Sequence, residues 1–386
     1  MTWGNIKNFA GLKGLTTIGV TDLSGNAISA GFWFYLASLL GAENYGHVSY
    51  LLAVAGIAST LSLTGASNTL TVYTAKNIRL ESSVYFISLI FAAIAVVVLV
   101  VLFSDYGVGV YVIGAVVFGL ASSEILGKKL YKSYPKYIIV QRLLMIGLAI
   151  GLYHLMGLNG IILGLGLAFL VYLPRIILGF KETRVNFSLL RERFSFIFHN
   201  YIWSLSTAFS GQFDKLIVAP FLGFEILGNY QLGIQLLAVL EMLPNVIFKF
   251  ILPQDASGNS NKKLKRITIL SAICLAAIGI VMSPILIPHF FPKFTPAIQV
   301  FQIVSLSLIP STINLTFISK FLGMEKSKLV LVSSGVYLTM QIILILTLGK
   351  AFGINGVATA FVISVCSQTV SLLIMDRTLL RTIGRT

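Results

Sequence analysis

Two opposite charges, Asp214 and Lys215, stand side by side inside an apolar stretch of the chain, GQFDKLIVAPFLGFEILGNY (211–230). A charged side chain within a membrane span costs roughly 2.5–3.5 kcal/mol on insertion scales unless it is paired or faces water. The pair therefore has two interpretations. Either its members line a passage and contact a substrate or an ion, or they pair with polar groups of neighbouring helices and stabilise the fold.

Other polar side chains also lie in apolar stretches at helical spacing. Asp22 and Asn26 are four residues apart and share one helical face, although an acid this close to a span end can also stay in water. Asn68 belongs to a second polar stripe, and Asn200 and Gln212 precede the charged pair. Small polar residues also hold membrane helices together, so each stripe is a candidate pathway lining or a packing face.

A third group combines an acid with a helix-breaking residue. Glu241 and Asn245 lie four residues apart, on one helical face beside Pro244. A glutamate in mid-membrane is costly when it is ionised. We therefore consider three states for Glu241: protonated, paired with Lys215, or acting as a proton-coupling group.

Two arginines, Arg142 and Arg175, lie near the predicted cytoplasmic ends of apolar stretches. Long basic side chains in such places often extend to the lipid headgroups. If they face a central vestibule instead, they would attract phosphate groups, because the guanidinium matches phosphate oxygens with two parallel hydrogen bonds.

The composition is that of a membrane protein. Of the 386 residues 56% are hydrophobic and 11% are charged, against about 25% charged residues in soluble domains, and the mean hydropathy is +0.91. The net charge of +15 would suit nucleic acid only if the basic residues clustered on a soluble face. They lie instead in short segments between apolar stretches. The two cysteines imply no disulfide framework or metal site, and we expect no cofactor.

We predict an all-α integral membrane protein with twelve transmembrane helices, because a helix needs about 20 mainly apolar residues to cross a bilayer. The predicted spans are 17–40, 46–72, 82–103, 107–127, 136–157, 159–180, 196–222, 226–252, 266–288, 296–322, 326–349 and 353–376. Every Lys and Arg except Lys215, Lys293 and Lys350 lies in the even-numbered connectors, the tails or the adjoining span ends. Because cytoplasmic loops carry the excess of Lys and Arg, both termini are predicted to be cytoplasmic.

Two short phrases recur in the same order along the chain. LGAENYG (40–46) recurs as LGFEILG (222–228), and GLNGI (157–161) recurs as GINGV (353–357). The pattern predicts a parallel repeat: a six-helix bundle over 1–180, a cytoplasmic linker over 181–195 and a second six-helix bundle over 196–386. Such proteins commonly bind their substrate between the halves and alternate access by rocking them.

The QFDKLI phrase (212–217), followed by Leu222-Gly223 and Gly228-Asn229-Tyr230, resembles the polysaccharide-transporter branch of the multidrug/oligosaccharidyl-lipid/polysaccharide (MOP) flippase superfamily. That branch includes O-antigen flippases of the Wzx type. The stretch 34–46 followed by Thr64-Gly65-Ala66 fits the same pattern, and the six-plus-six layout is MATE-like.

The resemblance implies a flippase that moves an isoprenoid-diphosphate-linked oligosaccharide or polysaccharide precursor to the outer leaflet of the cell membrane by alternating access. The implied partners are membrane lipid, the lipid-linked glycan, a coupling ion (H⁺ or Na⁺), and a glycan polymerase or glycosyltransferases. Two alternatives remain: a cation-coupled multidrug exporter of the same superfamily and, more distantly, a membrane glycan-processing enzyme. The short outer connectors, nearly free of ionisable groups, disfavour an enzyme.

Overall fold

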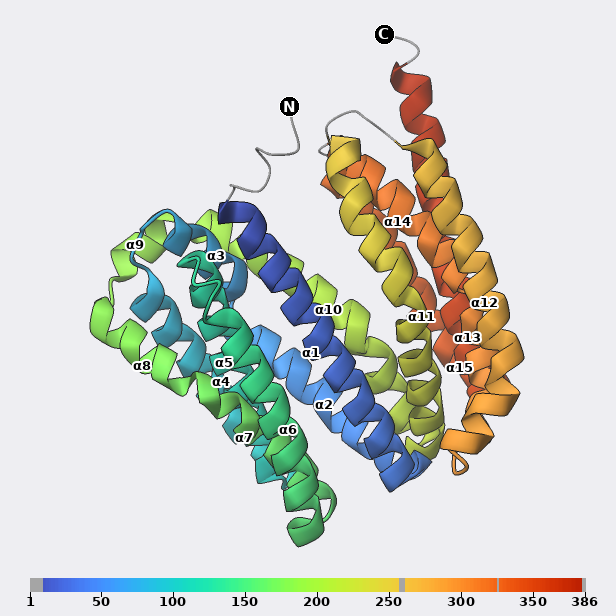
Figure 1. Ribbon diagram of the computed structural model, residues 1–386, viewed down its shortest axis with the longest axis horizontal. Coiled ribbons are helices and arrows are strands. Elements are labelled where there is room, and N and C mark those ends of the chain that lie inside the picture. Colours follow the sequence, from blue (N-terminus) through green and yellow to red (C-terminus); the bar gives the residue numbers. More distant parts are fainter. Residues whose placement is uncertain (1–9, 257–260, 325, 384–386) are drawn as a thin grey trace. The chain divides into compact units, whose positions relative to one another are not determined.

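The computed structural model of the chain describes residues 10–256, 261–324 and 326–383, and these residues form helices without a strand (Figure 1). The elements of the first part are α1 (Ala10–Leu40), α2 (Ala42–Leu63), α3 (Ala66–Ala75), α4 (Glu81–Phe103), α5 (Tyr106–Gly127), α6 (Tyr134–Met156), α7 (Leu158–Ala168), the 3₁₀ turn η2 (Phe169–Tyr172), α8 (Leu173–Glu182) and α9 (Phe187–Glu192). They are followed by α10 (Phe194–Leu222), α11 (Phe224–Ala256), α12 (Lys262–Phe290), α13 (Ala297–Ser305), α14 (Leu308–Gly323) and α15 (Ser327–Ile383).

Ten helical stretches among the described residues are long and apolar enough to cross a membrane. One of them is most of α15, in which Gly353 (φ 58°, ψ −134°) separates two helices. The predicted eleventh and twelfth spans both fall within that element. Helix α10, the predicted seventh span, is not among the ten, because its serines, Gln212 and the charged pair reduce its hydropathy. The number of twelve spans and the cytoplasmic termini stay predictions.

The predicted second span, 46–72, is interrupted. Helix α2 ends at Leu63, and Thr64 (φ 48°) and Gly65 (φ 76°) take left-handed conformations before α3 begins. A Cβ atom on Gly65 would lie 2.7 Å from the carbonyl oxygen of Ile197 and 2.8 Å from the backbone nitrogen of Tyr201. The break therefore lets α3 approach the backbone of α10, and only glycine combines this conformation with this contact.

The residues divide into two compact units, one made of 1–33 and 51–212 and the other of 34–50 and 213–386. The divisions fall inside α1, α2 and α10. The predicted bundles over 1–180 and 196–386 stay a prediction. The predicted linker contains α9, and its residues 183–186 hydrogen-bond to the start of α4: the hydroxyl of Ser82 lies 2.6 Å from that of Thr183, and the Asn186 amide donates to Ser83 Oγ at 2.7 Å.

In the first unit α5 packs against α3, α4 and α7. Its buried face includes Val116, Val117 and Leu120. Glycines bring α5 and α7 together: a Cβ on Gly114 would lie 2.5 Å from the Gly166 carbonyl, and one on Gly166 would lie 2.6 Å from the Tyr111 nitrogen. Small residues at such crossings are how membrane helices gain packing contacts.

In the second unit α11 packs against α12, α13, α14 and α15, and the GINGV phrase lies within α15. Gly157 (φ 67°, ψ −144°) and Gly353 (φ 58°, ψ −134°) adopt the same non-helical conformation. A Cβ on Gly160 would lie 2.1 Å from the Leu152 carbonyl oxygen, and one on Gly356 would lie 1.9 Å from that of Leu348. The two phrases therefore form the same tight helix–helix turn.

The other repeated phrase forms a reciprocal contact inside the second unit. Gly41 (φ 76°) and Gly223 (φ 97°) each precede a helix, α2 and α11. A Cβ on Gly46 would lie 1.9 Å from the Phe224 carbonyl oxygen, and a Cβ on Gly228 would lie 1.8 Å from that of Ala42. The two copies of the phrase thus pack against each other through equivalent atoms, as expected around a local two-fold axis.

We predict that Gly46→Ala or Gly228→Ala lowers the thermal unfolding temperature of the purified protein, because each added methyl group meets backbone that cannot rotate away. Overpacking of this kind costs about 1–3 kcal/mol. Gly31→Ala is the matched control, since no atom lies within 4 Å of a Cβ at that helical position. Equal unfolding temperatures for all three variants would contradict the close crossing.

Candidate functional site

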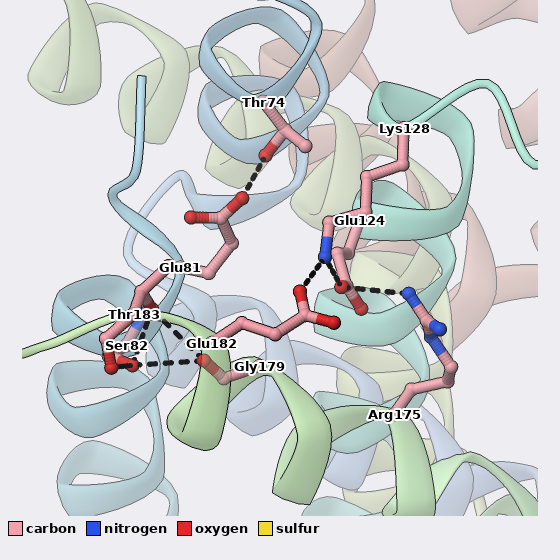
Figure 2. Close-up of polar contacts among 9 residues, drawn as sticks. All are labelled: Thr74, Glu81, Ser82, Glu124, Lys128, Arg175, Gly179, Glu182 and Thr183. Atoms are coloured by element: carbon pink, nitrogen blue, oxygen red, sulfur yellow. Dashed lines mark hydrogen bonds and ion pairs between the residues drawn. The ribbon is translucent and has the colours of Figure 1, made fainter. Parts of the chain in front are cut away.

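A buried carboxylate of the first unit forms ion pairs with two basic side chains. Glu124 of α5 has a fully buried side chain, and its Oε1 lies 2.7 Å from Lys128 Nζ and 2.9 Å from Arg175 Nη2. Lys128 also contacts Glu182, whose side chain is half exposed. Figure 2 shows Lys128 between the two carboxylates and Arg175 on the other side of Glu124. Arg175, a predicted pathway residue, is thereby held in an ion-pair network.

The charge of Lys128, which follows α5, is stabilised by this network. Partial burial alone lowers the pKa of its ammonium group, but the contacts with Glu124 and Glu182 outweigh burial and raise the pKa above its ordinary value. Beside the network lies a polar cavity of about 510 Å³. Its lining includes Arg79, Lys128 and Glu81, and the Oε1 atom of Glu81 accepts a hydrogen bond from Thr74 at 3.2 Å (Figure 2).

Asp22 and Arg142 lie on helices that face each other, α1 and α6. Asp22 Oδ1 accepts a hydrogen bond from the hydroxyl of Tyr134 at 3.0 Å. The Nε atom of Arg142 lies 3.9 Å from the position of a Cβ on Gly25, one turn after Asp22, and is buried without a hydrogen-bond partner in the described part of the chain. Asn26, also a predicted site residue, is exposed.

Two more predicted residues meet across α3 and α10. Asn68 donates a hydrogen bond to Asn200 Oδ1 at 3.1 Å. Gln212, farther along α10, has its Nε2 atom 4.0 Å from the position of a Cβ on Gly56 in α2. These side chains fit the description of polar residues that join membrane helices, and the sequence patterns allowed that interpretation as well as a pathway lining.

Asp214 and Lys215 are both buried in the second unit. The carboxylate of Asp214 lies 3.6 Å from Lys215 Nζ, and its two oxygens accept hydrogen bonds from the Lys215 backbone nitrogen at 2.8 Å and from the Tyr230 hydroxyl at 3.1 Å. Side chains 9% and 11% exposed leave little surface for a substrate. The two charges therefore contact each other, and Tyr230 of α11 is a further partner of Asp214. Their role as pathway residues stays a prediction.

Glu241 and Asn245 line a cavity of about 250 Å³ in the second unit, as their shared helical face predicts. Pro244 lies between them, and Ser311, Asn314 and Tyr337 line the cavity from α14 and α15. Asn314 donates to Gln368 Oε1 at 3.1 Å, while its own Oδ1 is buried without a partner among the described residues. The cavity therefore combines a carboxylate with several hydrogen-bonding groups, and one of them, the Asn314 carbonyl oxygen, is buried without a partner among the described residues.

Several ion pairs of the structure were not predicted from the sequence. Beyond the Glu124 network, Lys265 contacts Asp255 at 2.7 Å, and Lys320 contacts Asp376. The four-residue spacing of Glu124 and Lys128 was an available signal, but the partners of Lys265 and Lys320 are not neighbours in sequence. Among the described residues, no group of three or more His, Cys, Asp or Glu could hold a metal ion.

The amino-acid sequence matches a known protein family. The model of a family described as polysaccharide biosynthesis protein matches residues 12–254. The chain belongs to this family. No curated protein matches the chain by sequence.

Solved structures show the fold of this polysaccharide biosynthesis protein family member. It is similar to the lipid II flippase MurJ in an inward closed conformation, with a TM-score of 0.77 and 12% identity over 93% of this chain and 87% of that one. It is also similar to an inward-facing multidrug resistance MATE family transporter of the MOP superfamily, with a TM-score of 0.65 and 14% sequence identity over 97% of this chain and 99% of that one. A third similar structure is a MOP superfamily transporter from Pyrococcus furiosus, described as having a binding pocket of reverse polarity. Its TM-score is 0.64 and its sequence identity is 13% over 97% of both chains.

These likenesses confirm two predictions. The chain is a multi-pass, all-α membrane protein, and its fold is that of the MOP superfamily. The fold is shared with solved structures of a flippase and of transporters. The predicted site residues are not tested by the likenesses, and their roles stay proposals.

We predict that Glu124→Gln strongly destabilises this polysaccharide biosynthesis family member. Removing one partner of a buried ion pair costs about 3–5 kcal/mol, and both Lys128 and Arg175 depend on this carboxylate. Glu182→Gln is the matched control, because exposed pairs contribute about 0–1 kcal/mol. Thermal unfolding of the purified variants measures the difference, and equal shifts would show that Glu124 is not the centre of the network.

Proposed function

We propose that the chain is a flippase that moves an isoprenoid-diphosphate-linked oligosaccharide or polysaccharide precursor from the cytoplasmic to the outer leaflet of the plasma membrane. The family assignment to polysaccharide biosynthesis proteins and the MOP fold support a role in glycan export. Its partners are then membrane lipid, the lipid-linked glycan and the polymerase or glycosyltransferases that use or make it.

The observation that carries this proposal is the state of Arg142. Its guanidinium lies within an apolar helix, and none of the carboxylates in the described residues comes within 4 Å of it. The Oδ1 atom of Asp22, on the facing helix, accepts a hydrogen bond from Tyr134. A part-buried cation without a paired carboxylate favours an anionic ligand such as diphosphate, since the guanidinium binds phosphate oxygens bidentately. It disfavours cationic drugs.

Transport against a gradient also needs a coupling ion, and Glu241 is our candidate for its binding group. An intramembrane carboxylate is a functional candidate by default, and this one lines a cavity of the second unit together with Asn245, Ser311 and Asn314. Binding of H⁺ or Na⁺ there would change the charge of the cavity. The same feature is compatible with the competing proposal, a cation-coupled multidrug exporter, which the likeness to a MATE family transporter keeps open.

We expect Arg142→Gln to reduce glycan translocation by roughly tenfold or more, because a hydrogen bond to a charged group contributes about 1.5–3 kcal/mol and each 1.4 kcal/mol is a factor of ten. Arg142→Lys, which keeps the charge but loses the planar fork, recovers only part of the rate. Lys181→Gln, an exposed connector variant, keeps the full rate. Translocation is measured in vesicles containing the full chain, and an unimpaired Arg142→Gln protein would refute the assignment.

A second prediction concerns coupling. Glu241→Gln abolishes the acceleration of translocation by an imposed proton or sodium gradient, because a neutral amide cannot exchange a proton or neutralise a cation. Glu225→Gln, an exposed acid in the first turn of the same helix, retains the acceleration. A gradient effect that survives in the Glu241→Gln protein would assign coupling to another group.

A further inference from the structure

An apolar cavity of about 450 Å³ lies in the first unit between α3, α4, α9 and α10. Ligand pockets measure about 300–1,000 Å³ and are lined mostly by apolar side chains with a few polar groups. This cavity fits that description: α4 contributes Val84, Ile87 and Phe91, and α10 contributes Phe194, Phe198 and Tyr201. None of these residues is among the predicted site residues.

The lining of the cavity follows two helices for about two turns each. Its α4 lining runs from Val84 to Phe91 and its α10 lining from Phe194 to Tyr201, which at 1.5 Å per residue is about 10 Å in each case. Phe91, Phe194 and Phe198 are 50%, 64% and 46% exposed, so their rings offer apolar surface to whatever lies beside them. The shape suits a single hydrocarbon chain lying parallel to the spans.

The break between α2 and α3 forms the deep end of the cavity. Thr64 and Ala66 line it, and Gly65 between them lies against the backbone of α10 at Ile197 and Tyr201. The Thr64-Gly65-Ala66 phrase thus holds α10 close to α3 at this end of the cavity. Toward the connectors, the ring contact of Tyr73 with Phe196 also joins α3 to α10, with 5.3 Å between centroids.

The opposite end of the cavity is basic. Arg191 of α9 lines it, is exposed, and has no carboxylate within 4 Å in the described parts of the chain. Arg193 and Lys76 lie over the ring of Tyr73 at 5.5 and 5.9 Å, outside the lining, and Arg193 is paired with Glu192 at 2.8 Å. Arg191 is thus the one charged residue among the described residues of the lining, and it forms a cationic rim at the connectors, which the Lys and Arg distribution predicts to be cytoplasmic.

We propose that this cavity binds the isoprene units next to the headgroup of a polyisoprenyl diphosphate lipid, with the diphosphate at Arg191 and the rest of the chain in the bilayer. This inference rests on the proposed function and adds to it a carrier-lipid site that is separate from Arg142. Charge complementarity at the rim selects an anionic headgroup, because Arg binds phosphate oxygens bidentately. One apolar cavity with one arginine in its lining matches a lipid with one chain and one phosphorylated end, whereas a glycerophospholipid has two chains to place.

The experiment measures lipid binding to the full chain in detergent by native mass spectrometry. Three probes are titrated: a polyisoprenyl diphosphate, the corresponding uncharged polyisoprenol, and phosphatidylglycerol. Ile87→Trp fills the cavity, and Val101→Trp is its control because Val101 lies on α4 outside the cavity and is 74% exposed. Arg191→Gln removes the rim charge without changing the packing, and Arg184→Gln removes an exposed arginine of the same connector that does not line the cavity.

We expect the unmodified protein to bind the polyisoprenyl diphosphate at least tenfold more tightly than phosphatidylglycerol. Ile87→Trp weakens binding of both isoprenoid probes by at least tenfold. Arg191→Gln weakens binding of the diphosphate by a similar factor and leaves polyisoprenol binding unchanged. The two control variants bind like the unmodified protein.

The site is overturned if the diphosphate lipid binds and neither Ile87→Trp nor Arg191→Gln weakens it, or if phosphatidylglycerol binds equally well. In both cases the proposed flippase function is unaffected, because the carrier lipid is still bound elsewhere or bulk lipid occupies the cavity. Failure of the unmodified protein to bind any polyisoprenyl diphosphate would instead count against the proposed function together with the site. Because Arg191 is exposed, a folding defect of Ile87→Trp leaves the Arg191→Gln comparison decisive.

Discussion

A charged side chain in hydrocarbon must be neutralised or hydrated inside the protein, and this constraint organises most of the polar contacts of the chain. Glu124 holds Lys128 and Arg175, Asp214 holds Lys215, and Lys320 contacts Asp376. These groups have charged partners within the protein, although Glu124 Oε2 and Arg175 Nε are buried without a hydrogen-bond partner among the described residues. The ionisable groups outside such pairs are the strongest candidates for binding. Glu241 lines a cavity with several polar side chains, Arg142 has no carboxylate within 4 Å among the described residues, and Arg191 lines an apolar cavity.

Close helix crossings at glycine complement the charge pairs. Membrane helices gain no hydrophobic free energy by leaving lipid for each other, so contacts depend on backbones that approach closely. Both pairs of repeated phrases contain glycines at such close backbone contacts. Gly160 and Gly356 close equivalent turns, and Gly46 and Gly228 pack against each other's helices. The duplication is thus retained where backbone geometry demands glycine. The charges differ between the halves. Leu126-Gly127 recurs as Leu322-Gly323, at the same offset as GLNGI and GINGV. Two residues before these dipeptides the first half has the buried acid Glu124 and the second half has the base Lys320.

Much of the fold could be predicted from the sequence, because a bilayer imposes a fixed length and polarity on each helix. The apolar stretches, the repeat and the MOP resemblance were sufficient for this. The break at Thr64–Gly65 was not predicted, since it depends on contact with α10, far along the chain. Fewer of the contacts at the candidate site could be predicted, and the roles of its residues stay predictions. Glu241 and Asn245 do share a cavity, as their spacing indicated. The ion pair of Arg175 with Glu124 joins residues far apart in sequence, and the apolar cavity is lined by hydrophobic residues that no motif distinguishes.

The central claim is that the chain translocates an anionic, lipid-linked glycan. The most direct measurement reconstitutes the purified full chain in vesicles with a fluorescent polyisoprenyl-diphosphate oligosaccharide and follows the fraction of headgroups that a membrane-impermeant reagent can reach. A cationic dye is tested in parallel vesicles. The account predicts that the protein accelerates exchange of the glycan headgroup between leaflets and leaves the dye unmoved. Ion-driven transport of the dye without headgroup exchange would contradict it and identify a drug exporter.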